Sequence, residues 1–171
     1  DKGRHKCMTP TLSEDEIKMK FIQSYNLTMK DKKRVMDDTK EIIELLSDTK
    51  DIDVEINKTG DEITVITELV NKLINDHAKS NMSIDEYDRG YSELTTRYEE
   101  LEIKQKELIN KREDNKARVY IMNEFLSNLK HAKDKMSEWN DSFFTMMVES
   151  GMVHRDETIT FKLKNGKEIR S

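Results

Sequence analysis

Residues 52–77 read IDVEINKTGDEITVITELVNKLINDH, and this stretch decides the fold. Its mostly apolar positions recur at alternating intervals of four and three residues: Ile52, Ile56, Thr59, Ile63, Ile66, Val70, Leu73 and His77. That spacing places them along one stripe of an α-helix, as in a coiled coil. We therefore predict a long helix that packs through this stripe against a second helix.

A second stripe begins after an interruption at residues 80–83. Ser83 and Glu86 have the spacing of a capping box, which predicts the start of a new helix. The same spacing then continues through Ile84, Tyr87, Tyr91, Leu94, Tyr98, Leu101, Gln105, Leu108, Arg112, Asn115, Val119, Met122, Leu126 and Leu129. Two such helices joined by a turn of about six residues favour an antiparallel coiled-coil hairpin.

The turn also predicts how the two helices are aligned. If His77 lies near Ile84, the numbers of facing residues sum to about 161, and Ile52 meets Leu108 or Ile109. The paired arm then uses residues 52–109, with its tip at about 77–84, and its first helix reaches roughly 40 Å. With the return helix, we assign residues 48–130 to this region.

The segments before the arm are predicted to be helical as well. Ser13 and Glu16 form another capping-box pattern, and the sequence Ser-Asp-Thr at 47–49 predicts a break. Residues 13–47 are therefore assigned to base helices. We expect the end of the second arm helix, 119–129, to pack against residues 17–46.

The C-terminal part changes from helical to alternating periodicity. Met136, Trp139, Phe143 and Met147 predict a short helix over 134–150, capped by Gly151. Alternating apolar residues then predict strands near 152–155, 158–164 and 167–170, and Asn-Gly at 165–166 is a strong hairpin signal. A sheet this small is marginal alone, so we expect residues 151–171 to complete a sheet begun outside the chain.

Composition limits the classes of protein. Of the 171 residues, 38% are charged, against about a quarter in an average domain, and 35% are hydrophobic. With one proline and five glycines, the chain matches long helices and not loop-rich folds. It lacks an apolar run long enough for a membrane span or a secretory signal, so we expect a soluble intracellular protein.

Charge is unevenly distributed, although the formal net charge is only -5. Both ends are basic, through Lys2, Arg4 and Lys6 at one end and Lys162, Lys164, Lys167 and Arg170 at the other. Residues 41–63 are strongly acidic, which predicts that this part repels phosphates. A dense basic run at 30–34 fits either a solvated helix junction or a phosphate contact.

Candidate binding residues are few. Cys7 is the one cysteine, and with His5 it falls short of the four ligands of a zinc site, so a spare thiol is the simpler interpretation for this chain alone. Because the chain starts at Asp1, we expect it to be a fragment. His77 fits a pH switch or an exposed histidine at the end of a coiled coil. Met82 and Ile84 have nothing behind them to bury them at the tip, which predicts a protein contact, whereas Tyr87, Tyr91 and Tyr98 fit either ordinary stripe residues or a docking surface.

Catalytic motifs are not found: there is no P-loop, dinucleotide fingerprint, HExxH motif or nucleophile elbow. We therefore expect no catalytic residues and no bound cofactor in this fragment.

The order of several motifs resembles the C-terminal part of large serine recombinases, the phage integrases and conjugative-transposon recombinases. These motifs are Cys-Met-Thr-Pro at 7–10, Ser-Glu-Asp-Glu-Ile at 13–17, Asp-Glu-Tyr at 85–87, Val-His-Arg at 153–155 and Thr-Phe-Lys-Leu-Lys-Asn-Gly-Lys-Glu-Ile at 160–169. The resemblance covers essentially the whole chain, and its specificity lies in the order of the motifs.

This resemblance implies a function. In that family, a catalytic domain with a serine nucleophile precedes DNA-binding domains, one of which is a zinc ribbon carrying a coiled-coil arm. Arms of different subunits touch at their tips to support synapsis, and a directionality factor selects integration or excision. Cys7 matches the last zinc ligand of the ribbon, residues 1–12 match its end, and the terminal hairpin matches its closing strands.

Residue roles follow from the same resemblance. His77, Met82, Ile84 and Tyr87 would form the arm-tip contact, and Lys2, Arg4, Lys6, Lys162, Lys164 and Lys167 would contact attachment-site DNA in the bacterial cytoplasm. The intact protein would bind zinc. A structural coiled-coil protein without a DNA role is the alternative that the sequence leaves open.

Overall fold

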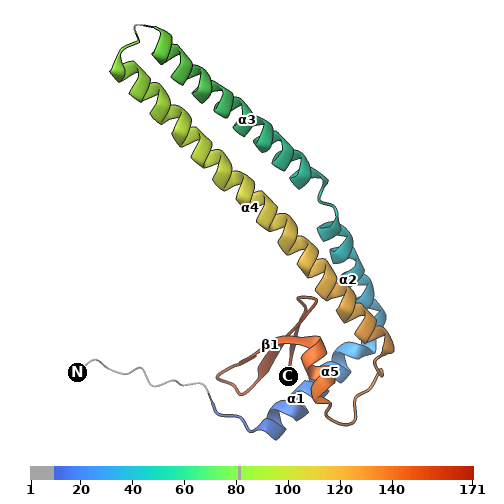
Figure 1. The fold of residues 1–171 in the computed structure, drawn as a ribbon. Helices are drawn as coiled ribbons and strands as arrows, with labels where there is room; N and C mark the ends of the chain where they lie inside the picture. The colour runs from blue at the N-terminus through green and yellow to red at the C-terminus, as the bar shows by residue number, and fades with distance from the viewer. Residues whose placement is uncertain (1–9, 81) are drawn as a thin grey trace, which may run out of the picture. The chain divides into compact units, whose positions relative to one another are not determined.

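The structure, a computed structural model, describes residues 10–80 and 82–171. It is mostly α-helical with one small antiparallel sheet, which confirms the predicted fold class (Figure 1). The elements are α1 (Glu14–Thr28), the 3₁₀ helix η1 (Met29–Asp31), α2 (Lys32–Ser47), α3 (Lys50–Lys79), α4 (Ile84–His131), α5 (Asp141–Met147), β1 (Val148–Val153), β2 (Ile159–Leu163) and β3 (Glu168–Arg170). The chain divides into an arm unit, residues 46–117, and a sheet unit, residues 1–45 and 118–171.

Helix starts in the arm unit follow the predicted signals. The Ser83 Oγ accepts from the Glu86 backbone N–H at 3.3 Å, and the Glu86 carboxylate accepts from the Ser83 N–H at 3.2 Å. α2 ends at Ser47 and α3 begins at Lys50, so the predicted break is confirmed. Thr49 precedes α3, and its hydroxyl donates to Asp53 Oδ2 at 2.9 Å instead of capping the helix.

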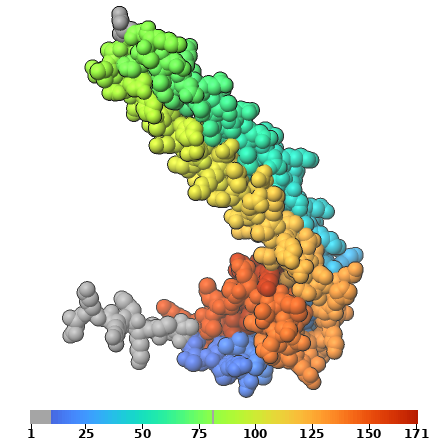
Figure 2. All heavy atoms as spheres, viewed as in Figure 1, coloured from blue at the N-terminus to red at the C-terminus, as the bar shows by residue number. Residues whose placement is uncertain are grey.

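The arm is an antiparallel pair of helices in contact along their length (Figure 2). All eight predicted stripe positions of α3 are buried or half-buried, and Thr59 and Ile66 are the most deeply buried. Leu101 is the most buried stripe residue of α4 within this unit. Two predicted stripe residues, Ile84 and Tyr91, are instead exposed, at 71% and 42%.

The predicted sum of about 161 lies within the range of the observed pairs across the arm. Lys104 pairs with Glu55 and Gln105 donates to the Ile56 carbonyl oxygen, with sums of 159 and 161, whereas the pairs at the two ends have sums of 164 and 165. His77 stacks on Tyr87 and not on Ile84, with ring centroids 4.4 Å apart. At the other end, Asp53 Oδ1 accepts from Arg112 Nη1 at 3.1 Å, where the predicted sum would place residue 108. Several alignments of α3 and α4 would bury a similar apolar stripe. The His77–Tyr87 ring stack and the Asp53–Arg112 ion pair favour the observed alignment.

The sheet unit has a core that combines helices and strands. β1, β2 and β3 form an antiparallel sheet in that order, with Gly151 opposite Phe161 and Phe161 opposite Ile169. The twelve buried core residues are Phe21, Tyr25, Met29, Val35, Phe125, Leu129, Met147, Val148, Ile159, Phe161, Leu163 and Ile169. The end of α4 thus packs with α1 and α2, as predicted.

The predicted short helix is present, but the bounds 134–150 are too wide at both ends. Only α5, residues 141–147, is helical, and its N-cap is Asn140, whose side chain accepts from the Phe143 N–H at 2.8 Å. The preceding segment is held by Asn26, which bonds both the N–H and the C=O of Met136. Gly151 lies inside β1, not at a helix end, because residues 148–153 pair with β2.

Candidate functional site

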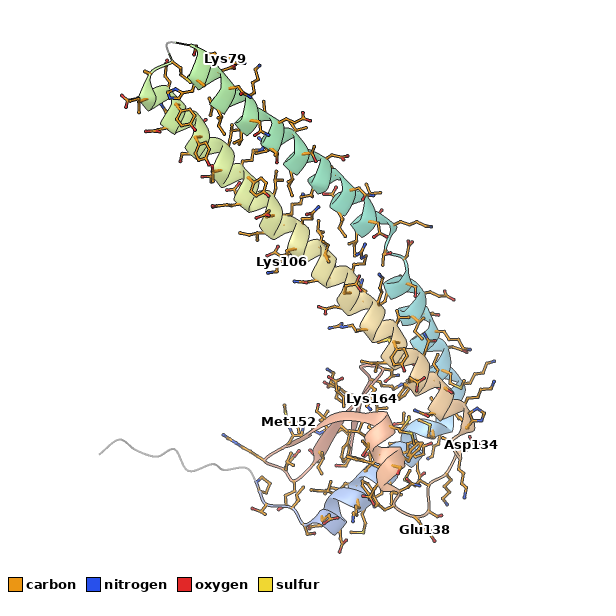
Figure 3. The ribbon with its side chains drawn as sticks, viewed as in Figure 1. Lys79, Lys106, Asp134, Glu138, Met152 and Lys164 are labelled. Atoms are coloured by element: carbon orange, nitrogen blue, oxygen red, sulfur yellow. The ribbon has the colours of Figure 1, made fainter. Side chains whose placement is uncertain are left out.

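The exposed apolar end of the arm is the first candidate site. We call Met82, Ile84, Tyr87 and Tyr91 the tip surface. α3 ends at Lys79, labelled in Figure 3, and α4 begins at Ile84. His77 of α3 stacks on Tyr87 in the first turn of α4, whereas Ile84 in the same turn is 71% exposed. An isoleucine left in water at a helix start can gain free energy by burial against a partner.

Aromatic stacking connects His77 to the two tyrosines of the tip surface. The His77 and Tyr87 rings lie 4.4 Å apart at 28°, and the Tyr87 and Tyr91 rings lie 5.8 Å apart at 24°. The Nδ1 atom of His77 is buried and has no hydrogen-bond partner. Stacking, and not hydrogen bonding at that nitrogen, therefore orients His77 and supports Tyr87.

Acidic residues surround the tip surface. Residues 82–91 contain Asp85, Glu86 and Asp88 against one arginine, Arg89, a formal charge of -2. Hydrogen bonds from Ser83 lower the pKa of the Glu86 carboxyl. The arm unit as a whole has 18 acidic and 11 basic side chains, a formal charge of -7. Such a surface disfavours contact with phosphates and suits a protein partner.

The predicted DNA-contacting lysines of the sheet unit differ in their surroundings. Lys162 Nζ pairs with Glu149 Oε1 at 2.9 Å, which neutralises part of its charge locally. Lys164 and Lys167 form no ion pair within the residues that the structure describes. They are therefore better placed than Lys162 to meet an anion. Lys2, Arg4, Lys6 and Cys7 lie outside the described residues.

A groove in the sheet unit is a second candidate site, and sequence reasoning missed it. We call it the sheet groove: about 730 Å³ between α4, the α5–β1 segment and the end of β2, where Lys164 lies (Figure 3). Its lining residues include Arg118, Tyr120, Ile121, Met146, Lys162 and Lys164. The sequence feature that could have indicated this groove is the pair Tyr120 and Ile121, two apolar residues that fall outside the four-and-three stripe of α4.

Metal binding finds no support among residues 10–80 and 82–171, where no three histidine, cysteine or carboxylate side chains are grouped to hold an ion. Within the same residues, no helix is long and apolar enough to cross a lipid bilayer.

Comparisons with known proteins do not assign the chain to a family. No family model, curated protein sequence or solved structure matches it significantly. The two candidate sites are therefore interpreted from their own chemistry: an acidic, apolar arm tip and an apolar groove bordered by cations.

Proposed function

We propose that this chain is the C-terminal part of a large serine recombinase. In this proposal the arm makes subunit contacts for synapsis and directionality, and the sheet unit contacts attachment-site DNA. The serine nucleophile belongs to a part of the parent protein outside this chain. The parent acts on DNA in the bacterial cytoplasm, with a directionality factor as a further partner.

The tip surface carries this proposal. A helical hairpin that ends in an exposed isoleucine, one turn of α4 from the stacked His77–Tyr87 pair, is suited to a protein contact at its tip. The motif order described above adds the recombinase assignment, which the tip geometry alone would not supply.

The charge distribution supports a division of roles between the units. The arm unit, at -7, should avoid the DNA backbone, whereas the described part of the sheet unit, residues 10–45 and 118–171, has a formal charge of zero and carries Lys164 and Lys167. In the parent, Cys7 would be the fourth ligand of a zinc ribbon that the terminal strands complete.

Sedimentation equilibrium of the chain tests the tip contact. We expect weak association that is lost in Met82→Asp/Ile84→Asp, with helicity by circular dichroism unchanged. Val54→Asp is the matched control, because Val54 is 63% exposed on α3 and outside the tip surface. Tight dimerisation that the tip substitutions leave unchanged would contradict the proposal and favour a structural coiled coil.

The recombinase assignment has its own tests. The coding sequence upstream should contain three more cysteines in zinc-ribbon spacing, and their absence would overturn the assignment. In the intact protein, Lys164→Glu should weaken attachment-site binding and make its salt dependence shallower. Lys130→Glu, on α4 outside the sheet groove, is the control. An unchanged salt slope would exclude a phosphate contact by Lys164.

A further inference from the structure

We propose that Asn165 is a deamidation site, which the folded chain protects and which reacts when the β2–β3 turn opens. Asn165 is the one asparagine in the sequence that is followed by glycine. Glycine has no side chain to hinder its backbone nitrogen, so this asparagine is the one most open to attack by its neighbour. The site is independent of the proposed recombinase role, because it follows from the chemistry of the turn alone.

Deamidation of this pair consumes water and releases ammonia. The backbone nitrogen of Gly166 loses its proton and attacks the side-chain carbonyl carbon of Asn165. The bond from that carbon to the amide nitrogen breaks, ammonia leaves, and a cyclic succinimide remains. Water then opens the ring at either carbonyl, which leaves aspartate or isoaspartate at position 165. Water is the only co-reactant, so the reaction belongs to the heat-sensitive chemistry that asparagine shows without an enzyme.

The folded chain holds both reacting groups away from this step. The Gly166 N–H donates to the Leu163 C=O at 2.8 Å, so the attacking nitrogen is engaged in a hydrogen bond. The Asn165 side chain, 5% exposed, is bound at both ends: Nδ2 donates to Thr39 Oγ1 at 2.8 Å and Oδ1 accepts from the Lys167 N–H at 3.1 Å. Attack requires a side-chain rotation that breaks these bonds, so the turn must open first.

The position of the turn allows such an opening. The turn follows Lys164, labelled in Figure 3, and leads into β3, which has three residues and lies at the edge of the sheet. Gly166 is exposed, and a Cβ built on it would meet no atom within 4 Å in the part of the chain that the structure describes. Short, exposed edge segments open at a lower free energy than the core of a fold. A minor open population therefore makes Asn165 reactive.

Deamidation would disconnect α2 from the turn. The Thr39 hydroxyl already donates to the Val35 C=O at 2.7 Å, so it accepts, and does not donate, toward Asn165. A carboxylate at position 165 has no hydrogen to give it, and it would place a negative charge beside an acceptor in a buried site. Isoaspartate also adds a carbon atom to the backbone of the turn. A turn that has reacted therefore does not close as before.

The rate of deamidation in the full chain tests the protection. The wild type is incubated at mildly alkaline pH with and without urea, and isoaspartate and the mass of the peptide that contains position 165 are followed over time. We expect the folded chain to react at least about tenfold more slowly than the unfolded chain, because the buried bonds must break first. A folded chain that reacts as fast as the unfolded one would overturn the protection. An unfolded chain that does not react would overturn the site.

Threonine variants identify the bond that gives the protection. Thr39→Val removes the acceptor of Asn165 Nδ2 and should speed deamidation about tenfold while circular dichroism shows a folded chain. Thr39→Ser keeps a hydroxyl and should react like the wild type. Thr28→Val is the matched control, because the Thr28 hydroxyl donates to the Ser24 C=O at 2.9 Å as Thr39 does to its own helix, whereas Asn165 bonds Thr39. Equal rates in all three variants would overturn protection by the Thr39 bond.

The variant Asn165→Asp reproduces one product and tests the consequence. We expect it to unfold at a lower urea concentration than the wild type, with a larger difference at neutral pH than in mild acid, because burial disfavours the charged carboxylate. An Asn165→Asp chain as stable as the wild type at neutral pH would overturn the loss of the connection to α2. None of these measurements involves DNA or a second copy of the chain, so their failure leaves the proposed function unchanged.

Discussion

The imidazole of His77, near the end of α3, lies almost flat against the phenol ring of Tyr87, in the first turn of α4, with centroids 4.4 Å apart. This contact closes the end of the helical hairpin. In the same turn of α4, Tyr87 is half-buried and Ile84 is exposed.

The stack should contribute measurable stability. We expect Tyr87→Ala to lower the free energy of unfolding by about 1 kcal/mol beyond the loss of buried area, as other aromatic pairs do. A double-mutant cycle with His77→Ala, followed by circular dichroism in urea, measures the coupling. Additive effects of the two substitutions would show that the rings do not stabilise each other.

The ion pair between Asp53 and Arg112 should make arm stability depend on acid pH. Hydrogen bonds from Thr49 and Arg112 lower the pKa of the Asp53 carboxyl below its ordinary value of 3.8. A carboxyl whose pKa is lower in the folded chain than in the unfolded chain stabilises the fold when the pH is above its unfolded pKa. This stabilisation is lost as the pH falls through the pKa of the folded chain. Thermal unfolding of wild type and Asp53→Asn should therefore differ at pH 6, and the difference should shrink as the pH falls below 3.8 and through the lowered pKa of the folded Asp53. A constant difference would contradict the linkage.

Gly60 offers a stabilising substitution. It lies inside α3, where alanine is favoured over glycine by up to about 1 kcal/mol. A Cβ there would lie 3.1 Å from Gln105 Nε2, the end of a flexible side chain that can move aside. We expect Gly60→Ala to raise the thermal midpoint. If it lowers the midpoint, repeating it in Gln105→Ala shows whether the Gln105 contact is the cause.

A buried hydrogen bond connects α2 to the β2–β3 turn. The Asn165 side chain donates to Thr39 Oγ1 at 2.8 Å, and both residues are buried. We expect Asn165→Ala to cost about 1–3 kcal/mol, because Thr39 loses this bond where water does not replace it. Asn123→Ala, on the exposed side of α4, should stay within about 0.5 kcal/mol in the same urea titration. Equal effects would mean that the buried bond adds no stability.

Local patterns predicted most of the secondary structure. The stripe spacing, two capping boxes and the Asn-Gly turn correctly located α3, α4, the start of α1 and the β2–β3 hairpin. Such signals succeed because they act between residues within a few positions of each other. Met82, Ile84 and Tyr87 were likewise selected from sequence, since the interruption at residues 80–83 showed where the arm turns, whereas Tyr91 joins the tip surface only in the structure.

Other features depend on contacts between distant residues. Met136 and Trp139 have helical spacing, yet they lie outside α5, because Asn26 bonds Met136 and Phe21 packs edge-on against Trp139. The groove lined by Tyr120 and Lys164 could not be found either, since its walls are more than 40 positions apart in the sequence.

The sequence by itself therefore determined that the chain forms a helical hairpin and a small antiparallel sheet, because helix periods, caps and tight turns are local properties. Only the tertiary structure decided how α3 and α4 are aligned, where β1 begins and which side chains line the groove. The physical reason is that a four-and-three stripe buries similar area in several alignments. The choice among them falls to particular pairs, such as His77 with Tyr87 and Asp53 with Arg112, that meet only once the chain has folded.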